Sequence, residues 1–234
     1  MDWARIGGDI HVWHGALDRE EEAIRPFEAT LSPEEKARAD RFHFARDRKR
    51  FVVARGLLRT LLAKYLRQSP AELEFSYGQH GKPFLAGENA LSGFCFNLSH
   101  SADFAVYGFA RSRNLGIDVE RIRPDSAGED IARRFFSAPE VNDLLTLPPE
   151  ARAEGFFHCW TRKEAYLKAR GQGLHIPLDS FSVSLLPGPA QFLGGVEPCW
   201  HLADFYPAEA YVAALVYDGA PCSIEYLSAD ADLK

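Results

Sequence analysis

The same helix-start signal occurs twice in this chain, and each copy precedes the same kinds of element. The first copy is Leu31-Ser32-Pro33-Glu34-Glu35, in which serine can cap a helix and proline fits its first turn. The second copy is Phe136-Ser137-Ala138-Pro139-Glu140. Helical patterns then run to about residue 66 in the first case and over about 151–169 in the second, where Gly171 and Gly173 end the helix. The repeat predicts a weak internal duplication, although two similar helix caps can also arise by chance.

Short alternating segments around these helices predict a small sheet in each part of the chain. A strand is expected to open the chain at residues 10–12. Further strands are expected at residues 73–77, 94–98, 103–110, 115–120, 180–185, 199–205, 210–217 and 223–227. Arg113-Asn114 predicts a turn and residues 187–189 predict a loop. Helices followed by a sheet, twice over, indicate an α+β protein.

Composition narrows the class of protein. With 234 residues, 46% of them hydrophobic, the chain can bury one large core or two smaller ones without disulfide or metal staples. The four cysteines form no Cys-x-x-Cys pair, which indicates neither a zinc site nor a secreted disulfide framework and favours a reducing cytoplasm. No stretch approaches the roughly 18 apolar residues of a membrane span, and no signal region opens the chain. The net charge of −6 argues against nucleic-acid binding as the main role. We expect a cytoplasmic protein without nucleic-acid or membrane partners.

The segment Gly116-Ile117-Asp118-Val119-Glu120 contains two carboxylates in an alternating pattern. As a strand it sends its apolar side chains to one face and Asp118 and Glu120 to the other. For such a pattern taken alone, a solvated sheet face is the ordinary interpretation. The functional alternative is a pair of metal or phosphate ligands.

The segment Trp160 to Lys168 follows a helical pattern. Trp160, Glu164 and Lys168 lie four residues apart along one stripe, with Lys163 beside them. Taken alone, Glu164 and Lys168 predict a surface ion pair that contributes about 0.3–0.5 kcal/mol. Together with the first segment they predict a magnesium-phosphate site, because Mg²⁺ prefers a few carboxylate oxygens plus the phosphate oxygens of a substrate.

The two segments resemble the two signature motifs of the 4′-phosphopantetheinyl transferases. Gly81-Lys82-Pro83 and Asn97-Leu98-Ser99-His100-Ser101 resemble two further family elements in the expected order, so the resemblance spans most of the chain. Arg50 stands where family members carry an arginine near the bound nucleotide. The length and the well-developed first half resemble the larger Sfp-like, pseudo-dimeric subclass.

The resemblance implies two similar α+β halves related by a pseudo-twofold axis, with the active site at their interface. We place the halves at residues 1–112 and 113–234, the second of which carries the main magnesium and phosphate motifs. The strand at 115–120 lies just past this boundary and is expected to extend the first sheet, so that Asp118 and Glu120 stand at the end of that sheet and Glu164 lies on the main helix of the second half. Because a duplicated chain completes its own site, we expect a monomer.

The resemblance also implies a magnesium-dependent holo-[acyl-carrier-protein] synthase activity. The phosphopantetheine arm of coenzyme A moves to a serine hydroxyl of an apo acyl or peptidyl carrier protein, and adenosine 3′,5′-bisphosphate is released. Asp118, Glu120 and Glu164 are expected to hold Mg²⁺, and Glu164, Lys168 and Asp118 to act in catalysis, with Glu164 orienting or accepting the serine proton. The residues expected to bind coenzyme A are Arg50, Lys82, Ser99, His100, Lys163 and Lys168.

Two other functions fit parts of the pattern. A non-catalytic protein of the same fold could bind coenzyme A or carrier proteins, but the intact carboxylate trio argues against it. A magnesium-dependent phosphohydrolase has no obvious need for the Asn-Leu-Ser-His and Gly-Lys-Pro elements. Sfp-like members often carry lysines in the first helix region, whereas this chain has Glu35 and Arg38, and we leave both out of the expected site. The segment 121–134 is expected to form part of the carrier-docking surface. The carrier could serve fatty-acid, polyketide or nonribosomal peptide synthesis.

Overall fold

The first part of the chain folds into a helical layer and a sheet. The computed structural model describes residues 10–78, 81–90, 92–124, 128–171, 175–185 and 189–232. The elements of the first part are β1 (Ile10–Ala16), α1 (Glu21–Thr30), α2 (Pro33–Ala39), α3 (Ala45–Leu66), the 3₁₀ turn η1 (Pro70–Glu72), β2 (Phe75–Tyr77), β3 (Pro83–Leu85), the 3₁₀ turn η2 (Gly87–Asn89), β4 (Phe94–Ser101) and β5 (Phe104–Arg111). α2 starts at the predicted cap, where Ser32 Oγ accepts the backbone N–H of Glu35 at 3.3 Å and the Glu35 carboxylate accepts that of Ser32 at 2.9 Å.

The second part repeats this order of elements. It contains β6 (Leu115–Arg121), α4 (Glu129–Phe135), α5 (Ala138–Thr146), α6 (Pro149–Arg170), the 3₁₀ turn η4 (Leu178–Ser180), β7 (Ser182–Val183), β8 (Phe192–Gly194), β9 (Trp200–Phe205), β10 (Tyr211–Asp218), β11 (Ile224–Ser228) and α7 (Ala229–Asp232). α5 also starts at its predicted cap, since the Glu140 carboxylate accepts the backbone N–H of Ser137 at 2.8 Å. Gly171 ends α6 with a left-handed φ of 66°. Gly173 and part of the predicted 187–189 loop lie outside the described residues.

Sheet topology confirms the duplication. The first sheet has the order β11-β1-β5-β4 and the second has the order β6-β10-β9. β1, β5 and β4 therefore correspond to β6, β10 and β9, and every pairing within these two sets is antiparallel. β11 has no counterpart in the first part and returns from the chain's end to pair in parallel with β1. The fold is α+β, with two similar halves.

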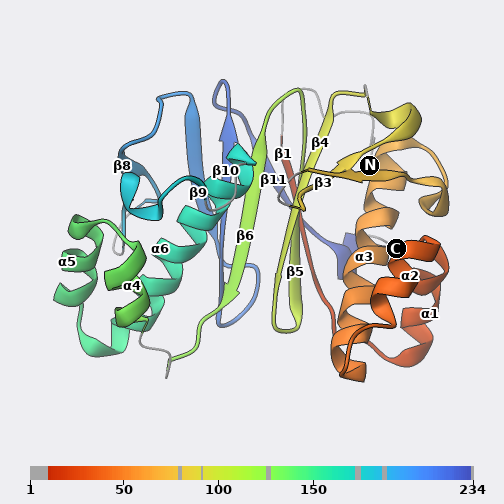
Figure 1. The fold of residues 1–234 in the computed structure, drawn as a ribbon, viewed down its shortest axis with the longest axis horizontal. Helices are drawn as coiled ribbons and strands as arrows, with labels where there is room; N and C mark the ends of the chain where they lie inside the picture. Colours follow the sequence, from red (N-terminus) through yellow and green to blue (C-terminus); the bar gives the residue numbers. More distant parts are fainter. Residues whose placement is uncertain are drawn as a thin grey trace.

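The helices of the two halves lie on opposite sides of the strands. In Figure 1, α1, α2 and α3 cover one flank and α4, α5 and α6 the other, with the strands of both sheets between them. One core joins α3 to the first sheet, a second joins α6 to the second sheet, and a third lies where the two sheets meet. At that junction β4 runs beside β6. A cavity opens beside β4 at this junction.

Some expected elements differ in the structure. β6 pairs with β10 rather than with β5, so Asp118 and Glu120 belong to the second sheet and not to the end of the first, contrary to our expectation. The expected strand at 180–185 is shorter in the structure, where only Ser182–Val183 form β7 and the 3₁₀ turn η4 ends at Ser180. Within the described part of the chain, none of the helices combines the length and the apolar character that a membrane crossing needs.

Candidate active site

A glycine lets α6 lie directly on β6. A Cβ atom on Gly116 would fall 2.2 Å from the backbone oxygen of Ala165 and 2.2 Å from the backbone nitrogen of Ala169, so no other residue fits without moving the helix. This close approach brings the last turns of α6, with Glu164 and Lys168, over the carboxylate face of β6. The glycine of the first motif therefore positions the second motif.

Asp118, Lys168 and Ser99 form one hydrogen-bonded cluster between the halves. Lys168 Nζ lies 2.6 Å from Asp118 Oδ1 and 2.9 Å from Ser99 Oγ, and Ser99 Oγ donates to the same carboxylate oxygen at 2.8 Å. Asp118 is buried. Because a charged lysine and a hydroxyl both contact one oxygen, the orientation of the carboxylate is fixed.

Two glutamates share the space around Asp118. Burial raises the pKa of Glu164, and the negative charges of Asp118 and Glu120 raise it further. Burial also raises the pKa of Glu120, and the Asp118 charge adds to this effect, while a hydrogen bond from Ser101 opposes it. The three carboxylates thus repel one another across a partly desolvated space, which is a place where positive charge is stabilised.

The donor set fits a hard divalent cation. Asp118 Oδ2 is buried and has no hydrogen-bond partner among the described residues, and the mutual repulsion of the carboxylates would be relieved by a cation. With the side chains in their present positions, however, no three histidine, cysteine, aspartate or glutamate residues of the described ranges lie close enough together to hold a metal ion. In this arrangement the Lys168 ammonium provides the positive charge beside Asp118.

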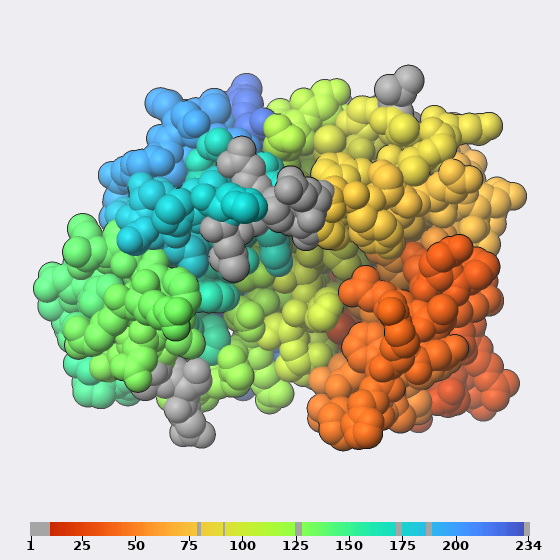
Figure 2. All heavy atoms as spheres, in the orientation of Figure 1, coloured from red at the N-terminus to blue at the C-terminus, as the bar shows by residue number. Residues whose placement is uncertain are grey.

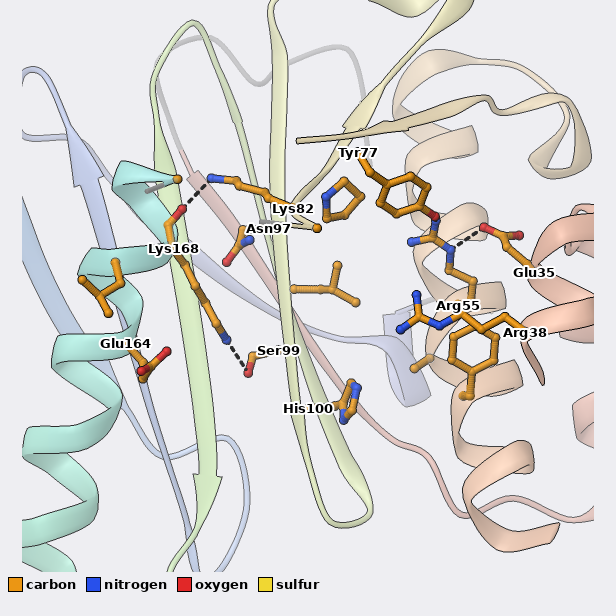
Figure 3. A pocket seen from close by; sticks show the side chains of 17 residues that line it. Glu35, Arg38, Arg55, Tyr77, Lys82, Asn97, Ser99, His100, Glu164 and Lys168 are labelled. Carbon is orange, nitrogen blue, oxygen red and sulfur yellow. Dashed lines mark hydrogen bonds and ion pairs between the residues drawn. The ribbon is translucent and has the colours of Figure 1, made fainter. Parts of the chain in front are cut away.

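A cavity of about 580 Å³ extends from this cluster to the helices of the first half. Figure 2 shows a hollow between the orange helices of the first half and the green and teal helices of the second, with yellow-green strands at its floor. In Figure 3, Glu164 and Lys168 approach it from α6, Asn97, Ser99 and His100 from β4, and Arg38 and Arg55 from α2 and α3. Both halves therefore contribute walls.

The far end of the cavity carries arginines. Arg55 contacts Glu35, and its Nη2 donates to the Tyr77 hydroxyl at 2.5 Å, while Arg59 Nε lies 2.6 Å from Glu35. Burial alone would raise the pKa of Glu35, but the hydrogen bonds and charges of the two arginines outweigh it and lower this pKa. Arg38 lies over the Phe51 ring, 5.2 Å from its centroid, and lines the cavity. Glu35 and Arg38, which we left out of the expected site, therefore both lie in its wall.

Lys82 and His100 also line the cavity, each in a distinct environment. Lys82 Nζ donates to the backbone oxygens of Lys168 at 2.7 Å and Leu115 at 3.1 Å, and burial lowers its pKa to about 8. The ammonium thus ties the β2–β3 hairpin to α6 and β6. The His100 side chain is exposed near the end of β4, and its partial desolvation, with the charges of Lys168 and Arg38, lowers the pKa of His100. At neutral pH His100 can therefore offer an uncharged imidazole.

Two residues expected to bind coenzyme A lie away from the cavity wall. Lys163 is fully buried, pairs with Glu140 at 2.8 Å, and donates to the backbone oxygens of Leu178 and Phe181 at 2.6 and 2.7 Å. One residue step along α6 turns the chain by about 100°, which directs this side chain into the core rather than toward the cavity. The guanidinium of Arg50 forms a two-point contact with Asp18, at 2.7 and 2.6 Å, and is absent from the cavity lining.

Sequence reasoning also missed four cavity or cluster residues. No sequence pattern predicted that Arg55 and Tyr77 line the cavity together, because their contact depends on the packing of β2 against α3. Asn97 and Ser101 stood inside a recognised motif without a role, and their alternation with Ser99 was the signal that could have placed all three on one face of β4.

Comparisons with known proteins agree across the chain. A family model described as "4'-phosphopantetheinyl transferase superfamily" matches residues 114–216, and one described as "4'-phosphopantetheinyl transferase, N-terminal" matches residues 19–110. The chain is 40% identical to the 4′-phosphopantetheinyl transferase HetI of Nostoc sp. (strain PCC 7120) over 92% of this chain and 90% of that protein. It is 35% identical to the 4′-phosphopantetheinyl transferase Sfp of Bacillus subtilis (strain 168), over 68% of each chain.

One solved structure gives a weaker likeness. The holo-[acyl-carrier-protein] synthase of Thermotoga maritima aligns with a TM-score of 0.37 and 23% identity, covering 46% of this chain and 64% of that one. The family assignment therefore depends on the sequence matches.

Proposed function

The chain belongs to the 4′-phosphopantetheinyl transferase superfamily, and from this premise we propose that it transfers the phosphopantetheine arm of coenzyme A to a serine of an apo carrier protein. The serine oxygen forms a bond to the phosphorus that carries pantetheine, and the pyrophosphate P–O bond breaks. Adenosine 3′,5′-bisphosphate leaves, and the serine proton passes to a base. The chain's own residues must therefore hold a long anionic substrate, balance charge on the leaving oxygen and place a base.

The observation that carries this proposal is the carboxylate and lysine cluster at one end of a cavity with arginines at the other. Asp118, Glu164 and Lys168 stand at the first end, and Arg38 and Arg55 at the second. A ligand with a diphosphate and a separate phosphate group matches two separated charged regions better than a single phosphate ester does. Both halves supply wall residues, which supports binding of a substrate long enough to reach from one to the other.

The Asp118, Glu120 and Glu164 carboxylates are the proposed ligands of Mg²⁺. When bound, the ion would supply charge stabilisation for the phosphate oxygens. Lys168 has its ammonium beside Asp118 and would add positive charge for the same phosphate oxygens. Glu164 is the proposed group for orienting or accepting the serine proton, because its raised pKa makes it a better base than an exposed carboxylate. His100 contributes a neutral imidazole for hydrogen bonding to phosphate.

We further propose that the protein is a monomer that acts in the cytoplasm, and that its two halves meet near residue 112. One chain supplies both walls of the cavity, so no second copy is needed to complete it. The carrier is proposed to dock near α4, where Ile131 and Phe135 are 44% and 37% exposed and Arg133 and Arg134 are exposed on the same short helix. Charge reversal of these two arginines should raise the KM for an acidic carrier, whereas Arg25→Glu on α1 should not; equal KM values in both variants would contradict the docking proposal.

The proposed reaction is tested by the intact mass of apo carrier proteins after incubation with this protein, coenzyme A and Mg²⁺. We expect a gain of one phosphopantetheine group that disappears with EDTA. Glu164→Gln should remove the gain, and Glu150→Gln, an exposed glutamate on the same helix, should retain it. No gain on any acyl or peptidyl carrier, despite coenzyme A binding, would instead support a non-catalytic binding protein.

A further inference from the structure

Side chains rather than a backbone ladder connect β4 to β6. In the described strand pairings β4 belongs to one sheet and β6 to the other. Three alternating residues at the end of β4 bridge the gap instead. Asn97 Oδ1 accepts the backbone N–H of Ile117 at 2.8 Å, Ser99 Oγ donates to Asp118 at 2.8 Å, and Ser101 Oγ donates to Glu120 at 2.6 Å. Each carboxylate of the β6 motif therefore has its own serine on β4.

The two serines differ in what else they contact. Ser99 Oγ is shared with the Lys168 ammonium. The oxygen of Ser101 accepts the backbone N–H of Arg121 at 3.2 Å. Because that bond uses a lone pair of the Ser101 oxygen, the hydroxyl proton remains available for Glu120. A backbone amide thus sets the direction of a single hydrogen bond to the carboxylate.

The turn that carries Ser101 is itself anchored to the second half. Ser101 pairs with Phe104 at the β4–β5 hairpin, and Asp103 lies in the turn between them. The Tyr211 hydroxyl donates to Asp103 Oδ1 at 2.6 Å, and the Asp103 backbone N–H lies 3.4 Å from the same hydroxyl. Tyr211 opens β10, the strand that pairs with β6. The hairpin and the Glu120 strand are therefore held to one another at the level of Ser101.

We propose that Ser101 is a positioning residue, which fixes one oxygen of Glu120 and leaves the other free for the divalent cation that Asp118, Glu120 and Glu164 would hold. The inference rests on the proposed function only in taking Glu120 as a ligand of that cation. A side chain that fixes a ligand in this way contributes to metal affinity, and losses of 10–100-fold are typical when it is removed. Ser101 does not contact the substrate in this proposal.

The test compares Ser101→Ala, Ser101→Thr and the matched control Ser180→Ala. Ser180 Oγ also donates one hydrogen bond of 2.6 Å, to the backbone oxygen of Pro177 in an exposed turn. Binding of Mn²⁺ as the probe is measured by electron paramagnetic resonance with coenzyme A present, and the Mg²⁺ concentration for half-maximal carrier modification is measured in parallel. We expect Ser101→Ala to weaken both by about tenfold or more, with Ser101→Thr and Ser180→Ala within about twofold of the parent, and the KM for coenzyme A at saturating Mg²⁺ unchanged.

Three results would overturn the inference: unchanged Mn²⁺ affinity in Ser101→Ala, equal weakening in Ser101→Ala and Ser101→Thr, or no Mn²⁺ binding by the parent protein. If the parent binds Mn²⁺ but modifies no carrier, the proposed function fails, and the Mn²⁺ affinities of the variants still decide the role of Ser101. Thermal unfolding of each variant is recorded so that a loss of fold is separated from a loss of affinity.

Discussion

Replacing Lys163 by Met should destabilise the protein strongly and leave coenzyme A binding unchanged. The Lys163 ammonium is fully buried, lies 2.8 Å from Glu140 Oε1 and donates to two backbone oxygens. Removing one partner of a buried pair costs about 3–5 kcal/mol, because the other charge remains without compensation. Glu140 would still accept the N–H groups of Ser137 and Val183 and the Ser137 hydroxyl, each at 2.8 Å, which favours the lower end of that range.

A loss of about 3 kcal/mol should lower the melting temperature by roughly 6–12 °C, since about 2–4 °C per kcal/mol applies to chains of this size. The control is Lys49→Met, which removes an exposed pair of similar length, 2.6 Å to Glu21, and should change stability little because solvent screens such a pair. Urea unfolding measures the stability, and calorimetry at low temperature measures coenzyme A affinity. In the double variant Lys163→Met with Glu140→Gln, part of the loss should return.

The opposite outcome would restore the sequence-based expectation. If Lys163→Met kept its melting temperature and bound coenzyme A about tenfold more weakly, with that loss absent from Lys49→Met, the ammonium would have to reach the substrate. The buried geometry would then not describe the functional state.

Three further predictions concern the site and its supports. Gly116→Ala should lower the free energy of unfolding by about 1–3 kcal/mol and reduce phosphopantetheine transfer, because it moves α6 off β6. Its control is Gly171→Ala, at a residue with a φ of +66° and open space around it. This change should cost about 1 kcal/mol of stability and leave transfer intact. Burial opposes the lowered pKa of Asp204, but the His158 ring nitrogen 3.3 Å away and a hydrogen bond from Arg162 bring this pKa from 3.8 to about 2. Stability should therefore fall by about 1–2 kcal/mol as pH drops through this window, and urea titrations of Asp204→Asn should show a smaller fall. Burial lowers the pKa of Lys82 from 10.5 to about 8, so between these pH values the unfolded chain binds more protons than the folded protein. The free energy of unfolding should therefore rise with pH across this window. Urea titrations of Lys82→Met should show a smaller rise.

Local signals in the sequence predicted local structure well. The caps at Ser32 and Ser137 and the αL end of α6 at Gly171 depend on neighbours within a few residues, and all three are present. These features need no knowledge of the rest of the fold.

Features that depend on distant packing were harder to predict. The partner of β6 is nearly a hundred residues away in sequence, and nothing in residues 115–120 distinguishes pairing with β10 from pairing with β5. The short strands β3 and β8 contain only three residues each and were missed. The charge of Lys163 predicted a role in binding coenzyme A, but the position of this residue around the α6 axis directs its side chain into the core beside Glu140. A charged residue type predicts function only where the fold leaves it accessible.

The duplication explains why the carboxylates occur in one half alone. The strand registers of the two halves are equivalent. Trp13, the fourth residue of β1, pairs with Tyr107 of β5. In the same way Asp118, the fourth residue of β6, pairs with Ala214 of β10. Where the second half has Asp118, the first half has an indole that is fully buried and donates its N–H to the Tyr65 hydroxyl at 2.8 Å. A second buried carboxylate there would carry a desolvation cost without a lysine of its own. One half of the scaffold therefore fills this position with a core side chain that stabilises the fold, and the cluster that suits phosphate chemistry needs to be built only once.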